Sequence, residues 1–150
     1  VIDRCNNLKI SCLSFNRTAF YVENHILAIL KTINPDVIVL AGFLWKFPES
    51  ILKEFPNKVI NVHPALLPKY GGKGMYGMRV HEAVVYNHEK ETGITIHYVN
   101  EHYDEGAIIF QASCTVGSND TAATVAEKIH KLEMEHFPRV VESFLFPNES

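Results

Sequence analysis

The sequence has few cysteines, no long apolar run and no large excess of charge of one sign. Its 150 residues include 3 cysteines, at positions 5, 12 and 114, and none of them forms a C-x-x-C pair. An odd number of widely spaced cysteines argues against a disulfide framework and favours a reducing compartment. We therefore expect structural cysteines and a cytoplasmic location.

Membranes and nucleic acids are excluded as partners on similar grounds. The longest apolar run covers residues 37–45, far short of the roughly 20 residues that a membrane-spanning helix needs. Asp3 and Arg4 stand where the apolar stretch of a signal peptide would begin. With 14 Lys and Arg against 17 Asp and Glu, the net charge is -3, which provides no basic surface for nucleic acid or anionic lipid.

What the chain does contain is the composition of one globular domain over residues 1–150. Hydrophobic residues make up 47% of the sequence and charged residues 21%. The branched apolar run at 37–41 is typical of a strand buried on both faces of a parallel sheet. A helix at 47–55 and a second strand at 59–63 complete a βαβ unit. The pattern predicts an α/β fold with a mostly parallel open sheet and an antiparallel hairpin.

The remaining segments complete this prediction. The spacing of apolar residues predicts helices over 1–8, 21–33 and 78–88, and a last helix from a cap at Asn119 or Asp120 to about 144, kinked at Pro138. It also predicts a short strand at 10–15 and a hairpin of strands 94–99 and 107–111, entered by a turn at Thr92-Gly93.

Three polar residues are candidates for chemistry. Asn61 and His63 are two apart on a predicted strand, so both side chains lie on one face near its carboxyl end. Asp104 follows another strand, and open sheets bind ligands beyond such ends. A histidine beside a carboxylate is suited to proton transfer. The structural alternatives are a strand end that bonds to nearby backbone and a solvated acidic turn.

Two other features carry weaker signals. The glycine-rich stretch 71–77 matches neither the nucleoside-triphosphate loop nor the dinucleotide motif, so it is interpreted as a flexible surface loop. His97 and His102 do not have the spacing of a standard metal motif, and we expect no metal.

Residues 61–70, Asn-Val-His-Pro-Ala-Leu-Leu-Pro-Lys-Tyr, resemble a highly specific string of the folate-dependent formyltransferases. Within them, the string is most similar to that of the enzymes that formylate glycinamide ribonucleotide in purine synthesis. Residues 36–43, 93–99 and 104–109 resemble further segments of the same family in the same order. The resemblance extends over essentially all 150 residues and implies a Rossmann-like formyltransferase fold.

The resemblance implies a reaction and three catalytic residues. The amine of glycinamide ribonucleotide would attack the formyl group of 10-formyltetrahydrofolate, the co-substrate, without a metal or a covalent enzyme intermediate. Asn61 would donate a hydrogen bond to the developing oxyanion, and His63 would add positive charge. Asp104 would help to carry the proton to the leaving folate nitrogen. The expected partners are these small molecules, and a homodimer remains open.

The resemblance also implies binding residues. A folate pocket, built largely from backbone groups, would lie at Leu44, Trp45, Lys46, Phe47, Asn100, Glu101, His102, Tyr103 and Asp104. Glu133 and His130 match substrate-binding positions on the last helix, although a solvated helix position is the alternative for Glu133. His97 would support the catalytic loop from behind.

One departure from the family bears on substrate binding. The family begins with a strand and a Gly, Ser and Asn loop whose backbone holds the substrate phosphate, and Val1 is preceded by no such segment. We therefore expect an N-terminally truncated domain that binds glycinamide ribonucleotide poorly. The alternatives are a formyltransferase acting on methionyl-tRNA, a formyltetrahydrofolate deformylase, or a non-catalytic folate- or nucleotide-binding fragment.

Overall fold

The computed structural model describes residues 1–146, and its chain divides into a unit of residues 1–34 and a second unit that begins at Pro35. The first unit holds helices α1 (Ile2–Asn7), α2 (Arg17–Tyr21) and α3 (His25–Ile33). The helix predicted over 21–33 starts only at His25, because Asn24 adopts a positive φ of 53°. Asn16 caps the separate helix α2 by accepting a hydrogen bond from the Ala19 backbone at 2.9 Å.

The strand predicted at 10–15 is wrong. These residues are irregular, and Ile10 and Leu13 are each 57% exposed. A strand requires the backbone of a partner, and no described residue pairs with this segment.

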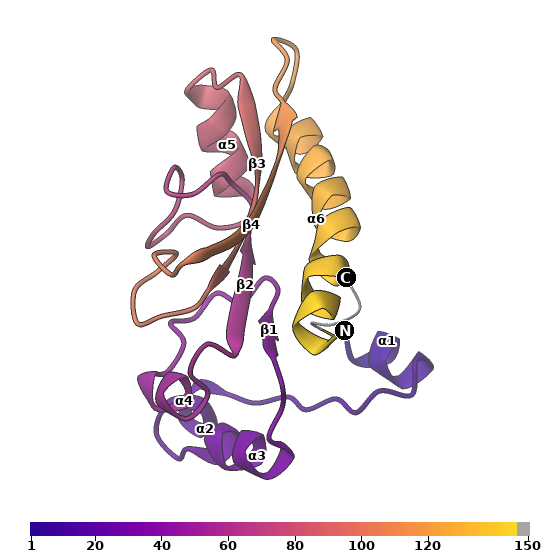
Figure 1. Cartoon of the computed structure of the whole chain (residues 1–150). Coiled ribbons are helices and arrows are strands. Elements are labelled where there is room, and N and C mark those ends of the chain that lie inside the picture. The colour runs from indigo at the N-terminus through magenta and orange to yellow at the C-terminus, as the bar shows by residue number, and fades with distance from the viewer. Residues whose placement is uncertain (147–150) are drawn as a thin grey trace. The chain divides into compact units, whose positions relative to one another are not determined.

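The second unit is built on a four-stranded open sheet in the order β1 (Ile38–Leu40), β2 (Val59–His63), β3 (Glu91–Tyr98) and β4 (Ile108–Thr115). Helices α4 (Glu49–Glu54), α5 (Met78–Tyr86) and α6 (Ala122–Leu145) complete it, with α6 running along one side of the sheet (Figure 1). The α/β class, the open sheet and the antiparallel hairpin are thus confirmed.

The predicted predominance of parallel pairing is wrong. Among the strands of residues 1–146, only β1 and β2 are parallel, whereas β2–β3 and β3–β4 are antiparallel. His63, the last residue of β2, pairs with Thr95, so residues 91–94 extend beyond the carboxyl end of β2. After β2, the segment that contains α5 leaves the chain beyond the carboxyl end of β2. Strand β3 begins there and runs antiparallel to β2.

Strand β1 is also less buried than its sequence predicts. In the described sheet it pairs on one side only, and Val39 is 40% exposed. An apolar run predicts burial on both faces only where other strands and layers cover it, so the sequence signal alone overstated the burial of this strand.

Gly93 lies within β3 and not in the predicted turn. A Cβ atom placed on it would lie 2.0 Å from the backbone oxygen of Ala112 on β4. The residue is therefore a glycine because the two strands approach closely there, and β3 begins at Glu91.

Helix α6 starts with a capping box at Thr121, two residues after Asn119 and one after Asp120, the two predicted caps, and continues through Pro138 to Leu145. Asp120 instead accepts hydrogen bonds from the Gly117 backbone at 2.7 Å and from the Thr124 hydroxyl at 2.8 Å. The capping signal was thus correctly located to within a residue or two but assigned to the wrong side chain.

The alternation of side chains gives the sheet two unlike faces. Val62, Ile94 and Ile96 pack into a core with Val84 of α5 and with Val125 and Ile129 of α6. The opposite face carries Asn61, His63, Thr95 and His97, which we call the polar face. Asn61 pairs directly with His97 across the strands, and His63 pairs with Thr95.

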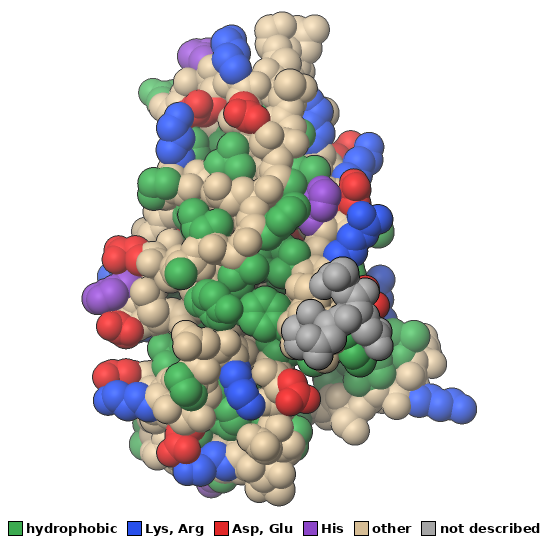
Figure 2. Space-filling view, viewed as in Figure 1, with side chains coloured by type: hydrophobic (Ala, Val, Ile, Leu, Met, Phe, Trp, Pro, Cys, Tyr) green, Lys and Arg blue, Asp and Glu red, His purple; other side chains and the backbone are tan. Residues whose placement is uncertain are grey.

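Neither the visible surface charge nor the described helices point to a nucleic-acid or membrane partner. On the face that Figure 2 shows, acidic and basic side chains are interspersed. Within residues 1–146, no helix combines the length and the apolar character that crossing a membrane requires.

Candidate active site

Asp104 reaches the polar face by a different route from the one that the sequence predicted. The carboxyl end of β3 lies beside the start of β2, because Tyr98 pairs with Ile60. The loop after β3 nevertheless turns back over the polar face. It places Oδ2 of Asp104 3.5 Å from Nδ1 of His63 and Oδ1 of Asp104 3.6 Å from Nε2 of His97. The expected proximity is therefore present, although the two strand ends do not meet.

The bonding of His63 assigns roles to its two ring nitrogens. Nε2 lies 2.7 Å from the backbone oxygen of Tyr70, and since a carbonyl only accepts, Nε2 donates. Nδ1 is the nitrogen that faces Asp104. When the ring is doubly protonated, both N–H groups have an acceptor, so this site accommodates an imidazolium beside a carboxylate.

His97 fixes the orientation of Asn61. Its Nδ1 donates to the backbone oxygen of Tyr98 at 2.8 Å, so in the neutral ring Nε2 accepts a hydrogen bond from Nδ2 of Asn61 at 3.1 Å. Burial lowers the pKa of His97, and a charge on His63 acts in the same direction, while the Tyr98 carbonyl and Asp104 oppose it. A neutral His97 thus keeps the amide group of Asn61 in one rotation.

A single loop after β2 contacts both members of the His63–Asp104 pair. Tyr70 accepts from His63, and the backbone N–H of Gly72 donates to Oδ2 of Asp104 at 2.9 Å. Gly71 lies between these contacts, and a Cβ atom there would approach Asp104 Cβ to 3.3 Å and Leu67 Cδ2 to 2.5 Å. Glycine therefore lets the loop lie close to Asp104 without a shift of the Leu67 or Asp104 side chain.

The polar face opens into a cavity of about 980 Å³, large enough for a small-molecule ligand. Asn61, His63 and Asp104 all contribute to its wall, as do the predicted residues His130 and Glu133 of α6, which lie 3.2 Å apart. The other lining residues are 41–44 after β1, 62 and 64 on either side of His63, 72–79 and 81 with the start of α5, Tyr103, and positions 126, 127 and 129 of α6.

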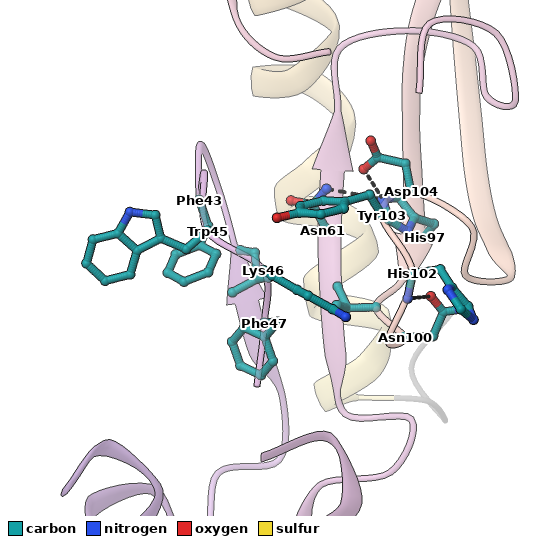
Figure 3. A pocket seen from close by; sticks show the side chains of 12 residues that line it. Phe43, Trp45, Lys46, Phe47, Asn61, His97, Asn100, His102, Tyr103 and Asp104 are labelled. Atoms are coloured by element: carbon teal, nitrogen blue, oxygen red, sulfur yellow. Dashed lines mark hydrogen bonds and ion pairs between the residues drawn. The ribbon is translucent and has the colours of Figure 1, made fainter. Parts of the chain in front are cut away.

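A smaller recess of about 60 Å³ adjoins this cavity and shares four lining residues with it, Phe43, Asn61, Tyr103 and Asp104. Figure 3 shows Phe43, Trp45 and Phe47 on one side of the recess and His97 with Asp104 on the other. Of the residues expected to bind folate, the recess includes Trp45, Lys46, Phe47, Asn100, His102, Tyr103 and Asp104.

Two of the expected folate residues lie elsewhere. Leu44 lines the large cavity and not the recess. Glu101 contributes to neither wall, and its side chain, 59% exposed, lies 3.7 Å from that of His102 at the surface. The recess also includes Leu40, Phe43 and Val99, which the sequence analysis did not single out.

His81 of α5 is a buried polar residue of the site that the sequence did not indicate. It is 6% exposed and lines the large cavity, and in the described part of the chain its Nδ1 has no hydrogen-bond partner. Burial lowers its pKa, with further contributions from His130 and His63. The available signal was its position three residues before the buried Val84, on the apolar side of the helix.

The sequence matches a known protein family over most of its length. The profile of the formyl transferase family matches residues 11–141. The chain belongs to the formyl transferase family. A similar family member is phosphoribosylglycinamide formyltransferase of Bacillus subtilis, 34% identical over 151 aligned residues that cover 97% of this chain and 74% of the relative.

Other formyl transferases give the same result. The chloroplastic phosphoribosylglycinamide formyltransferase of Arabidopsis thaliana is 42% identical over 111 residues, which are 71% of this chain but 38% of that protein's length. The crystal structure of the Bacillus halodurans phosphoribosylglycinamide formyltransferase superposes with a TM-score of 0.85 at 28% identity, covering 100% of this chain and 76% of that one. The chain thus spans less than half of the plant relative and about three quarters of the bacterial ones.

Proposed function

We propose that this formyl transferase moves a formyl group from 10-formyltetrahydrofolate to the primary amine of glycinamide ribonucleotide. The observation that carries the proposal is the convergence of Asn61, His63 and Asp104 on the wall of one cavity. An amide donor, an imidazole and a carboxylate are the groups that transfer of an acyl carbon between two nitrogens needs. The names of the relatives from Bacillus subtilis and Arabidopsis thaliana support the same reaction.

The proposed reaction is an addition followed by an elimination. The amine nitrogen bonds to the formyl carbon, and the carbonyl oxygen takes up the electron pair. The bond from that carbon to N10 of the folate then breaks as the oxygen re-forms its double bond. One proton moves from the attacking amine to N10, so the products are the formamide and tetrahydrofolate.

Asn61 and His63 stabilise the oxyanion in this scheme. His97 holds the Asn61 amide with its nitrogen as donor, and a second N–H of the same amide is available for the formyl oxygen. Nδ1 of His63 lies 3.5 Å from Asp104, beyond a short hydrogen bond, so in a protonated ring this N–H can be shared with the reacting oxygen while Nε2 stays bonded to Tyr70. Preorganised donors of this kind contribute roughly 3–4 kcal/mol each.

Asp104 is the proton carrier of the proposal. Its carboxylate lies between the two histidines, and its side chain is 13% exposed. A water molecule that it binds can take the proton from the amine and deliver it to N10, while His63 balances the charge of the carboxylate. The Gly72 N–H holds Oδ2 in place during this exchange.

Folate and nucleotide occupy the two adjoining spaces in the proposal. The recess has aromatic side chains on one wall and polar residues of β3 and the loop after it on the other, a combination suited to a flat pterin ring with hydrogen-bonding edges. His130 and Glu133 line the large cavity and would bind the nucleotide there. Among the described residues, no group of His, Cys, Asp and Glu side chains is arranged to hold a metal ion, and the proposed reaction uses none.

Replacement of Asp104 tests the proposed function. The purified protein is mixed with 10-formyltetrahydrofolate and millimolar glycinamide ribonucleotide, and tetrahydrofolate release is followed. In D104N we expect turnover to fall by at least about 100-fold, the scale of a lost general acid–base group. Folate binding, measured by titration, should stay within about threefold, since the pocket contacts made by the loop backbone persist.

The neighbouring Glu105 provides a matched control. It is exposed and lies one residue along the same loop, so E105Q removes a charge without touching the site and should retain turnover. The proposal fails if the unmodified protein releases no tetrahydrofolate above the uncatalysed rate, or if D104N is as active as E105Q.

A further inference from the structure

We propose that Thr95 is a positioning residue that sets the placement of His63 relative to Asp104. This inference rests on the proposed function, because the pair that it positions is the proposed catalytic pair. Thr95 has no contact with the recess or the cavity, and its side chain acts through the loop that follows β2.

The hydroxyl group of Thr95 uses its full hydrogen-bonding capacity on that loop and its anchor. It donates to the backbone oxygen of Ala65 at 2.7 Å and accepts from the backbone N–H of Leu67 at 2.9 Å. It also accepts from the side chain of Gln111 at 2.8 Å. One donor and two acceptor sites are all that a hydroxyl offers, and Thr95 is 0% exposed.

Gln111 of β4 provides a second attachment for the same loop. Its Nε2 donates to the backbone oxygen of Leu67 at 3.1 Å in addition to the Thr95 hydroxyl. Thr95 and Gln111 are paired directly across β3 and β4. The loop is therefore fastened at residues 65 and 67 to two strands of the sheet.

The fastened loop is the one that contacts both proposed catalytic side chains. Ala65 lies two residues after His63, and the loop continues to the Tyr70 carbonyl that accepts from His63. Two residues later, the Gly72 N–H donates to Asp104. A shift of this loop would change the His63 ring and the Asp104 carboxylate together, and a misplacement of about 1 Å can cost roughly 100-fold in rate.

Three variants of β3 test the inference. T95V keeps the shape of the side chain but removes all three hydrogen bonds, and we expect kcat to fall about 100-fold while the KM for folate changes less than about threefold. T95S restores the hydroxyl and should recover kcat to within about tenfold of the parent. T92V makes the same change at another buried threonine of β3, which is 2% exposed and forms none of these bonds, and it should match the parent.

A spectroscopic readout separates this inference from the proposed function. The Nε2–H proton of His63, assigned by comparison with H63Q in ¹H–¹⁵N spectra, should exchange slowly with solvent because it is bonded to Tyr70. In T95V it should exchange faster or shift, whether or not the protein turns over substrate. If T95V fails to fold, Q111M, at the exposed end of the network, provides a second comparison, because it removes the two bonds that Gln111 makes to Leu67 and Thr95.

The possible results distinguish failure of the positioning role of Thr95 from failure of the proposed function. An active parent with T95V or Q111M unchanged in both kcat and the His63 signal overturns the positioning role and leaves the proposed function intact. An inactive parent overturns the proposed function, and the His63 signal then decides the positioning role alone. Equal losses in T95V and T95S would also count against it, because rescue by the hydroxyl is its distinctive requirement.

Discussion

The polar face and the helical rim of the large cavity differ in how completely their polar groups are satisfied. On the polar face, His63, Thr95 and His97 are at most 3% exposed, and each has hydrogen-bond partners at defined atoms. On the rim, formed by His81, His130 and Glu133, the Nδ1 atom of His81 has no partner among the described residues, and the side chain of His130 is 81% exposed.

This difference is what we expect if the polar face carries out catalysis and the rim binds substrate. A catalytic centre gains from groups that are already oriented before the ligand arrives, because no reorganisation is then needed in the transition state. A substrate-binding wall can leave polar groups for the ligand itself to satisfy. We infer that substitutions on the polar face change kcat, whereas substitutions on the rim change KM and stability.

The largest effect is expected on the polar face. N61A removes the proposed oxyanion donor and the partner of His97, and kcat should fall by about 100- to 1000-fold with little change in folate binding. Steady-state kinetics and a folate titration measure the two quantities. N119A, at an exposed position on the turn before α6, is the control and should behave as the parent does. A loss confined to KM in N61A would place Asn61 among the binding residues instead.

A smaller effect is expected on the rim. E133Q keeps the size of the side chain but removes its charge, and the KM for glycinamide ribonucleotide should rise about tenfold, the scale of one hydrogen bond to a charged group. The kcat should stay within about twofold. E135Q, whose parent side chain is 58% exposed, provides the control on the same helix. A fall in kcat equal to that of N61A would remove the distinction between the two regions.

The smallest effect is expected on the pH dependence of the protein's stability. Burial lowers the pKa values of His81 and His97 from the ordinary value of 6.5. The unfolded chain then binds more protons than the folded one, so stability is full above about 6.5 and declines as pH falls below it. H81F removes one of these groups and should flatten the acid side of the profile, measured as the urea midpoint between about pH 7 and 5.

An exposed histidine serves as the control for this profile. The side chain of His25 is 66% exposed, and H25Q should leave the pH profile as it is in the parent. If H81F declines with acid as steeply as the parent does, His81 makes no contribution to acid sensitivity.

The parts of the fold that could be predicted are those governed by local pattern. Strand β2 was predicted over 59–63, the residues that it occupies, and period-2 alternation placed Asn61 and His63 on one face. The helices α1, α4 and α5 were predicted to within a few residues. Each depends on the spacing of side chains within one segment, which the sequence displays directly.

The parts that could not be predicted depend on which segments of the chain lie next to one another in the fold. The direction of β3, the exposure of β1 and the absence of a strand at 10–15 are decided by which backbone lies alongside. Gly93 resembles a turn residue in sequence, and the close approach of the β4 backbone at Ala112 and Ser113 explains it. His81 and Glu101 show the same limit for the site, because burial or exposure of a single side chain is a property of the assembled fold.

The most direct test of the account compares turnover of D104N with that of E105Q at equal folate occupancy. If an imidazole, an amide and a carboxylate act together on one formyl group, D104N should bind folate but turn over at least about 100-fold more slowly than E105Q. Equal turnover of the two variants would contradict the account, since the carboxylate beside His63 would then have no part in the reaction.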